Sequence, residues 1–229
     1  MKLTYFGHAC FGIEAAGRHL LFDPFISPNP LAAGIDVDAV PADAIFLSHG
    51  HVDHVADAVR IARRTGACVV ANWEIAGWLE RQGVENVLPM NHGGSVQLDG
   101  IKARMTSAIH SSSLPDGSYG GNPGGFVVSG SNDSFYYSGD TALTMDMKMI
   151  GEEESLRFAV LPIGDTFTMG VADAIKAARW TGARDVVGVH YNTFPPIAID
   201  IAQAISSFES AGLRLHLPAI GASLEFSRS

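Results

Sequence analysis

The sequence predicts an α/β protein, and three observations support this fold class. Short apolar runs of the kind that form buried strands alternate with amphipathic stretches of helical period. The 25 Gly and 11 Pro residues indicate many tight turns. The second part of the chain also repeats the order of elements of the first. The 229 residues therefore fit a single domain of two αβ halves, roughly residues 1–115 and 116–229.

The first half is expected to begin with a β-meander and then to alternate strands with helices. Apolar residues recur at helical spacing from Val55 to Ala62 and basic residues come late, so residues 53–64 predict an amphipathic helix. Asp99-Gly100 is a strong hairpin signal. The predicted strands are 2–6, 11–15, 19–22, 45–48, 68–71, 87–90, 95–98 and 101–107, and the predicted helices are 53–64 and 74–82.

The second half is expected to follow a loop. Residues 114–125 are rich in Pro, Gly and Ser and show no periodicity, and a loop of this length is often functional. Residues 143–150 are rich in Met and predict a short helix or a loop. The predicted strands are 126–129, 134–138, 158–163, 184–189, 213–217 and 223–226, and the predicted helices are 171–181 and 200–211.

Composition narrows the class of partners. The formal net charge of −9 argues against a polyanion such as tRNA or DNA, which needs a basic surface. From these residues, we expect neither a signal peptide nor a membrane span, since no long apolar run is present. Its two Cys are far apart and predict no disulfide. We expect a cytoplasmic protein that acts on a small molecule, without nucleic acid or membrane; a homo-oligomer stays open.

The densest group of metal-binding side chains is His49-Gly50-His51-Val52-Asp53-His54, directly after the strand that ends at Ser48. His49 and His51 are two positions apart, so their rings can point the same way in an extended or turning backbone, and Gly50 permits backbone angles that a side chain would forbid. Asp53 and His54 come one turn later and can face a second metal. Imidazole and carboxylate ligands suit zinc, iron, manganese or nickel. A histidine-rich loop that binds nothing is the alternative, and the density of ligands argues against it.

This stretch resembles the H-x-H-x-D-H motif of the metallo-β-lactamase fold superfamily. The chain is similar to the small bacterial and archaeal metal-dependent hydrolases of that superfamily, a group that also resembles the ascorbate-phosphate lactonases. The resemblance covers nearly the whole chain. It implies an αββα sandwich: two mixed sheets packed face to face, with helices on both outer faces.

The resemblance also implies two metal sites. The first would use His49, His51 and His110, and three His with an open fourth position is the pattern of a catalytic zinc site. The second would use Asp53, His54 and His190, with Asp140 bridging both ions. Two divalent ions are expected, with Zn²⁺ first and Mn²⁺, Fe²⁺ or Ni²⁺ as alternatives.

Four further residues are candidates for supporting or substrate-binding roles. His8 lies in a Gly-His-x-x-Phe segment that resembling proteins place near the metals, although it could instead bond a loop carbonyl. Asp23 precedes Pro24 and is the best candidate to orient a ligating His. Asp165 is expected beside a ligand or facing substrate; its neighbour Thr166 stands where relatives often have His. Asn122, like Tyr119, could contact substrate, with loop packing as the alternative.

The remaining histidines have simpler interpretations. His92 is expected to cap a turn, and His19 and His216 alternate with apolar residues and are expected at the surface. Cys68 is expected to be a small core residue.

The motif predicts hydrolysis by a hydroxide held between two metal ions and oriented by Asp53. A lactone or a phosphodiester is the favoured substrate, and it could be anionic. A nuclease of the tRNA-processing type is the first alternative, and the acidic charge and lack of a long basic insertion argue against it. A non-catalytic metal-binding protein on the same fold is the second.

Overall fold

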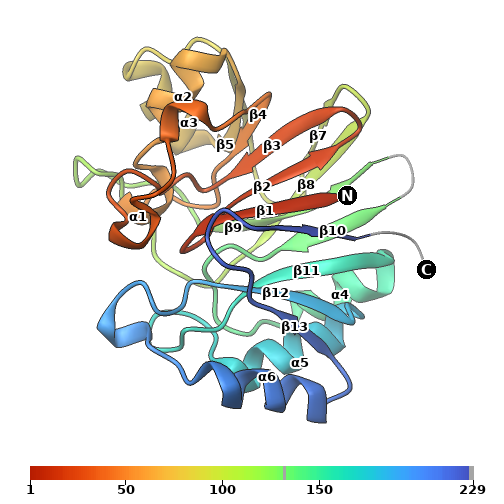
Figure 1. Ribbon diagram of the computed structural model, residues 1–229. Coiled ribbons are helices and arrows are strands. Elements are labelled where there is room, and N and C mark those ends of the chain that lie inside the picture. Colours follow the sequence, from red (N-terminus) through yellow and green to blue (C-terminus); the bar gives the residue numbers. More distant parts are fainter. Residues whose placement is uncertain (131–132, 227–229) are drawn as a thin grey trace. The chain divides into compact units, whose positions relative to one another are not determined.

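The computed structural model describes residues 1–130 and 133–226, which form two compact units. Unit 1 comprises Met1–Gly94, Ser111–Pro123 and the described residues from Pro218 on; unit 2 comprises Ser95–His110 and the described residues of Gly124–Leu217. Each unit contains one seven-stranded sheet (Figure 1). The predicted α/β class is confirmed. The two units do not coincide with the expected halves 1–115 and 116–229, because the strands within Ser95–His110 pair in the second sheet.

Unit 1 is built on a mixed sheet with the strand order β14-β1-β2-β3-β4-β5-β6. β14, β1, β2 and β3 pair antiparallel, whereas β3 to β6 pair in parallel. The parallel strands consequently end at the same edge, where loops can converge. The strands are β1 (Lys2–Gly7), β2 (Cys10–Ala15), β3 (Arg18–Phe22), β4 (Ala44–Phe46), β5 (Cys68–Asn72), β6 (Val87–Met90) and β14 (Ser223–Glu225).

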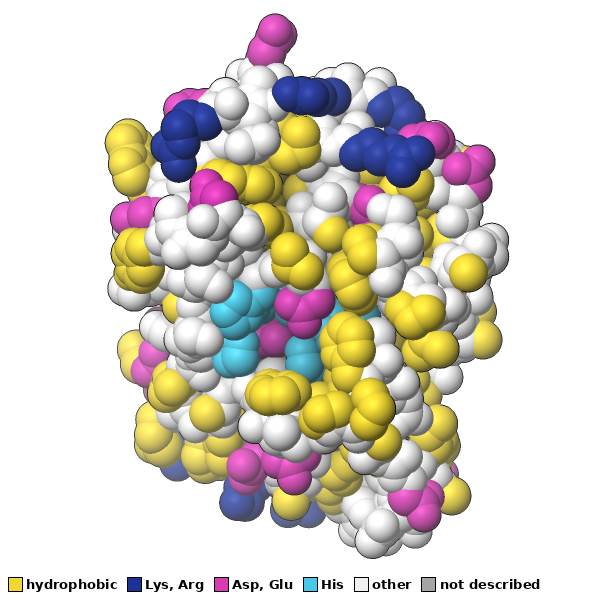
Figure 2. Space-filling view, turned by 90° about the vertical axis from the view of Figure 1, so that its left-hand side faces the viewer, with side chains coloured by type: hydrophobic (Ala, Val, Ile, Leu, Met, Phe, Trp, Pro, Cys, Tyr) yellow, Lys and Arg dark blue, Asp and Glu magenta, His cyan; other side chains and the backbone are white. Residues whose placement is uncertain are grey.

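The helices of unit 1 cover one face of this sheet. Buried residues of α2 and α3, such as Ile61 and Leu79, pack in one core with Ile45 and Val69 of the strands. Figure 2 shows Lys and Arg side chains near its upper end, where α2 and α3 lie in Figure 1. The helices are α1 (Val52–Val55), α2 (Ala58–Thr65) and α3 (Trp73–Arg81), with 3₁₀ turns η1 (Pro30–Ala32) and η2 (Val37–Ala39).

The predicted helix over 53–64 is wrong in one respect, because Asp57 divides it into α1 and α2. Its backbone N–H bonds the carbonyl of Pro24 at 3.0 Å instead of continuing the helix. Its buried carboxylate accepts the N–H groups of Ile26 and Ser27 at 2.7 and 2.8 Å and also the Ser27 hydroxyl. These bonds to a loop distant in sequence compete with the helical ladder, and no local periodicity signals them.

Unit 2 is built on a second mixed sheet, with the order β13-β12-β11-β10-β9-β8-β7. β10 to β13 pair in parallel, whereas β7 to β10 pair antiparallel. β8, β10 and β12 therefore run in the same direction, and their carboxyl ends share one edge. The strands are β7 (Ser95–Leu98), β8 (Ile101–Ser107), β9 (Gly124–Ser129), β10 (Ser134–Tyr137), β11 (Leu156–Pro162), β12 (Asp185–Val189) and β13 (Arg214–His216).

Three helices pack on the sheet of unit 2: α4 (Asp146–Glu153), α5 (Val171–Thr181) and α6 (Ile201–Ser210), with a 3₁₀ turn η3 (Pro195–Ile197). Figure 1 shows them on the same side of β11, β12 and β13. Ile150, Ala177 and Phe208 each bury their side chains in a core with Ala159 and Val186 of the strands. The Met-rich segment contributes to α4, which begins and ends later than the predicted range 143–150. Among the described residues, no helix is long and apolar enough to cross a membrane.

Candidate metal centre

The histidine-rich loop of unit 1 follows β4 at its carboxyl end, as the sequence predicts. His51 precedes the first turn of α1, and Asp53 and His54 lie within that turn. Gly50 is required for close packing: a Cβ there would lie 3.1 Å from the carbonyl oxygen of Ser113. Its φ is not in the left-handed region, so the expected need for unusual backbone angles is wrong. The loop is instead held tightly against the segment that starts at Ser111.

The first pair of donors in unit 1 is His49 and His51. Nε2 of His49 lies 2.9 Å from Nδ1 of His51, so these two nitrogens face the same point. Nδ1 of His49 is 3.0 Å from the Ser48 hydroxyl, which fixes the ring and directs Nε2 outward. His49 is fully buried and His51 partly exposed. Figure 2 shows histidine and acidic side chains reaching the surface on this face of the molecule.

The carboxylate of Asp23 holds the histidine-rich loop in place. Its carboxylate accepts the Ser48 N–H at 2.8 Å and the Ser48 hydroxyl at 2.5 Å, and it lies 2.8 Å from Nδ1 of His54. Asp23 is fully buried, and its φ of 42° places it in the left-handed region. Because its partner is Nδ1 of His54, Nε2 is the atom of that ring that can bind a metal.

A second group of donors in unit 1 joins His8, Asp53 and His54. Nε2 of His8 is 3.1 Å from a carboxylate oxygen of Asp53, which lies 3.9 Å from Nε2 of His54. One donor atom from each of the three residues lies within 4.8 Å of the others. His8 is buried, with a φ of 55°, and Phe25 packs against its ring edge. The break between β1 and β2 therefore aims His8 at Asp53.

Unit 2 brings its three predicted ligands together at one edge of its sheet. His110, Asp140 and His190 follow β8, β10 and β12, the strands whose carboxyl ends share that edge. One carboxylate oxygen of Asp140 lies 3.0 Å from Nε2 of His190 and 3.7 Å from Nε2 of His110. Asp140 and His190 are buried. A carboxylate that faces two imidazoles can hold a metal with either of them.

Hydrogen bonds of Thr141 fix this edge. Its hydroxyl accepts the Ile109 N–H at 2.9 Å, and its carbonyl accepts the Met169 N–H at 2.9 Å. The loops that carry His110, Asp140 and residues 164–170 are therefore tied together within unit 2.

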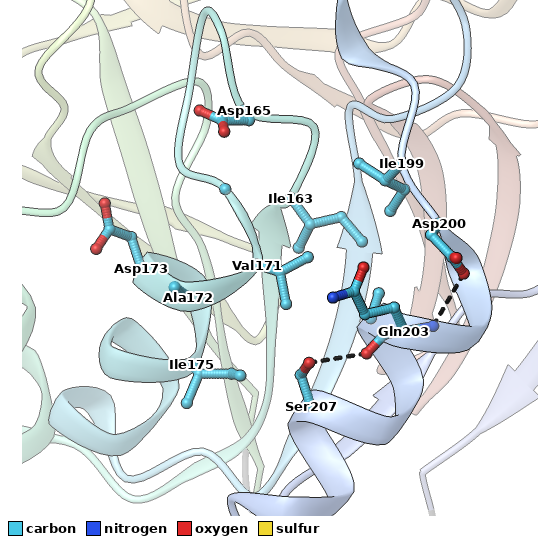
Figure 3. A pocket seen from close by; sticks show the side chains of 12 residues that line it. Ile163, Asp165, Val171, Ala172, Asp173, Ile175, Ile199, Asp200, Gln203 and Ser207 are labelled. Carbon is cyan, nitrogen blue, oxygen red and sulfur yellow. Dashed lines mark hydrogen bonds between the residues drawn. The ribbon is translucent and has the colours of Figure 1, made fainter.

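Asp165 lies in unit 2 at one end of a groove of about 550 Å³ between α5 and α6 (Figure 3). The polar groups of the groove have structural roles. Asp200 caps α6 by accepting the Gln203 N–H at 3.0 Å, and the Ser207 hydroxyl donates to the Gln203 carbonyl at 2.8 Å. Asp165 itself accepts the Thr166 N–H at 2.8 Å. Its role toward substrate stays a prediction.

The remaining histidines bond to neighbouring groups. Nε2 of His92 lies 2.8 Å from the Pro123 carbonyl oxygen, and the exposed His19 lies 3.4 Å from Asp43. His216 is half-buried instead of exposed, because Nε2 lies 2.7 Å from a carboxylate oxygen of Asp185 on the adjacent strand.

Both cysteines are free thiols. Cys10 is fully buried, and burial raises the pKa of its thiol well above the usual value. Burial also raises the pKa of the half-buried Cys68 thiol. Neither is activated as a nucleophile.

Sequence patterns alone did not identify three supporting residues: Ser48, Asn72 and Ser112. Ser48 orients His49, as described above. The Ser112 hydroxyl accepts the N–H of Gly50 at 3.1 Å, and Asn72 donates to the carbonyl of Gly120 at 2.8 Å. Asn72 carries a local signal, since Asn between a strand and a helix suits an N-cap. Ser112 lies 62 residues from Gly50 and carries none.

Fold and site together define the class of the protein. Residues 18–191 match the β-lactamase superfamily domain. The chain is similar to Igni18, a metallo hydrolase from the archaeon Ignicoccus hospitalis, with a TM-score of 0.88, 35% identity and coverage of 99% of both chains. An isothiocyanate hydrolase from Delia radicum gut bacteria shares the fold, with a TM-score of 0.81 at 21% identity and 99% coverage of both chains. The protein has the metallo-β-lactamase fold.

Comparison with curated sequences identifies the family. A UPF0173 metal-dependent hydrolase of Methylacidiphilum infernorum is 50% identical over 224 residues, 98% of this chain and 99% of that protein. Another from Flavobacterium johnsoniae is 48% identical over 225 residues, 98% of this chain and all of that protein. The chain belongs to the UPF0173 family of metal-dependent hydrolases.

Proposed function

We propose that this hydrolase uses two divalent metal ions to cleave the ester bond of a small substrate, either a lactone or a phosphodiester. One observation carries the proposal. A single loop of unit 1 presents two pairs of donors, His49 with His51 and Asp53 with His54, and His8 reaches Asp53 from the break between β1 and β2. Two groups on one loop suit two ions at the short separation used by binuclear hydrolases.

The donor atoms suit such ions. Two nitrogens bound to one tetrahedral zinc lie about 3.3 Å apart when each Zn–N bond is about 2.0–2.1 Å. Nε2 of His49 and Nδ1 of His51, at 2.9 Å, are close to that spacing. The carboxylate of Asp23 fixes the orientation of His54, an arrangement typical of histidines that bind metals.

Within unit 1, His49 and His51 would hold one ion, and Asp53 and His54 the other. Within unit 2, His110, Asp140 and His190 are the further ligands that the superfamily motif implies, and the carboxylate of Asp140 faces both imidazoles. His8 supports the second site through Asp53. Zn²⁺ is the ion that this mixture of imidazole and carboxylate ligands favours, and Mn²⁺, Fe²⁺ or Ni²⁺ would also fit.

When bound, two such ions acidify water and polarise the scissile bond. The protein orients the reactants. Asp53, whose side chain is 28% exposed, can accept a proton or a hydrogen bond from the attacking water. His8, at 3.1 Å, holds that carboxylate in place.

The experiment is metal analysis combined with a hydrolysis screen of lactones and phosphodiesters. We expect about two ions per chain and turnover of one substrate class. His49→Ala and Asp140→Ala should lose metal and activity together, because the ligands act as one unit. His92→Ala is the matched control, since its ring bonds a loop carbonyl, and it should retain both.

Wild-type metal content and rate in both ligand variants would contradict the assignment of the site. Metal uptake without turnover of either class would contradict the proposed substrates.

A further inference from the structure

The segment Ser111–Pro123 of unit 1 is attached firmly to the histidine-rich loop. The Ser112 hydroxyl accepts the Gly50 N–H at 3.1 Å and donates to the Gly120 carbonyl at 2.9 Å. The buried side chain of Asn72 donates to the same carbonyl at 2.8 Å. A Cβ on Gly120 would lie 2.5 Å from the Ser112 hydroxyl and 3.4 Å from the Cα of Gly50. The two loops therefore lie in direct contact, and hydrogen bonds hold their spacing.

The pairing of this segment places Tyr119 near the histidine-rich loop. Ser113 and Tyr119 form an isolated antiparallel bridge, and paired residues project to the same face of a ribbon. The carbonyl oxygen of Ser113 would lie 3.1 Å from a Cβ at Gly50, the residue before His51, so Tyr119 is bridged to a residue that touches the histidine-rich loop. The Ser111 hydroxyl is 3.4 Å from Nε2 of His51. Ser111 and Ser113 are about 7 Å apart along the chain, and the bridge from Ser113 to Tyr119 spans about 5 Å. The Tyr119 ring is therefore within reach of a substrate bound at His51.

The Tyr119 side chain is exposed but fixed. It is 62% exposed. Its hydroxyl donates to the side-chain oxygen of Asn122 at 2.8 Å. The backbone of Asn122 is itself held by Asn72, at 3.2 Å. A largely exposed ring whose hydroxyl is hydrogen-bonded can offer a stacking surface that loses little conformational entropy on binding.

We propose that Tyr119 is a specificity-determining residue of this hydrolase, and that its ring stacks on an aromatic or similarly planar group attached next to the scissile bond. The preferred substrates are then aryl-substituted lactones or phosphodiesters. Asn122 acts on substrate through Tyr119, as the acceptor that orients the ring. This inference rests on the proposed function, since a metal-bound substrate must lie beside His51.

The test compares two ligands that differ only in the ring. Phenylphosphonate and methylphosphonate offer the same anionic group to the metals, and isothermal titration of the metal-loaded chain gives their affinities. We expect phenylphosphonate to bind about three- to tenfold more tightly, the range expected for an aromatic pair. Tyr119→Ala should abolish the difference, and Tyr119→Phe, which keeps the ring, should retain most of it.

Met149→Ala is the matched control, because it removes a 58% exposed side chain from α4 of unit 2. It should bind both phosphonates like the wild type. Thermal melting of each variant checks folding, and Tyr119→Phe preserves the test if Tyr119→Ala does not fold.

Three results would each overturn the inference. The wild type could bind both phosphonates equally, it could bind neither, or the preference for the ring could persist in Tyr119→Ala. Failure of the proposed function has a different signature. In that case the ring preference and its loss in Tyr119→Ala would remain, while neither lactones nor phosphodiesters were hydrolysed.

Discussion

At the scale of single residues, Asp23 does the most to shape the candidate site. Its carboxylate serves both the backbone and the hydroxyl of Ser48 and also the ring of His54. Ser48 in turn orients His49. One fully buried side chain therefore sets the direction of two imidazoles that we assign to different metal ions.

We predict that Asp23→Asn weakens metal binding about 10- to 100-fold, the usual effect of losing a partner that orients a ligand. The amide has one acceptor oxygen in place of two, so it cannot serve Ser48 and His54 together. Competition with a chromophoric chelator measures the affinity.

Asp43→Asn is the matched control, because this carboxylate also lies near a histidine, His19, but at an exposed position. It should keep the wild-type metal affinity. Equal affinities for Asp23→Asn and the wild type would show that Asp23 does not position the ligands.

At the scale of elements, the edge of the second sheet depends on charged side chains. β13 pairs with β12 through three residue pairs, and Asp185 of β12 contacts both Arg214 and His216 of β13. Burial acts to raise the pKa of Asp185, but hydrogen bonds from the Arg214 guanidinium and from His216 outweigh it and lower the pKa. Asp185 thus stabilises β13 in its ionised form.

The sign of this shift gives a pH dependence. A carboxyl whose pKa is lower in the folded state stabilises the fold above its unfolded pKa of about 3.9, and this contribution is lost as the pH falls through the folded value. We therefore predict that Asp185→Asn lowers the free energy of unfolding by about 1 kcal/mol at pH 7, the range of a partly exposed ion pair. The difference from the wild type should shrink below a pH of about 4.

Urea unfolding at several pH values measures this effect. Asp173→Asn, which removes an exposed pair with Lys176 within one helix, should change stability by a few tenths of a kcal/mol. A constant difference between Asp185→Asn and the wild type down to acid pH would contradict the linkage.

At the scale of the whole molecule, bound metal should contribute to stability. The candidate donors of unit 1 come from the break between β1 and β2 (His8) and from the loop after β4 with α1, so an ion held there would join segments distant in sequence. The net charge of −9 would also be partly neutralised. A ligand that binds only the folded state stabilises it by about 2.7 kcal/mol at 100 times its Kd.

We predict that a chelator lowers the melting temperature by about 5–10 °C, given about 2–4 °C per kcal/mol for a chain of this size. Calorimetry with and without the chelator measures the shift, and added Zn²⁺ should reverse it. His49→Ala should melt lower than the wild type and respond less to the chelator. An unchanged melting temperature after chelation would show that metal does not stabilise the fold.

Much of the secondary structure could be predicted because its signals are local. The helix over 171–181 has the predicted bounds, and Asp99-Gly100 forms the predicted hairpin turn between β7 and β8. Periodicity failed where a distant group competes with a local bond. Asp57 ends one helix and starts another because its partners, Ile26 and Ser27, lie about 30 residues away.

The sequence by itself determined the expected class of chemistry: His49, His51, Asp53 and His54 lie within one short loop, and their spacing predicts a metal site before any fold is known. Only the tertiary structure decided what surrounds them. It brought Asp23 to His54 across 31 residues, His8 to Asp53 across 45, and Ser112 to Gly50 across 62. The reason is physical: ligand type and spacing are local properties of the chain, whereas hydrogen-bond partners are chosen by the packing of strands and loops.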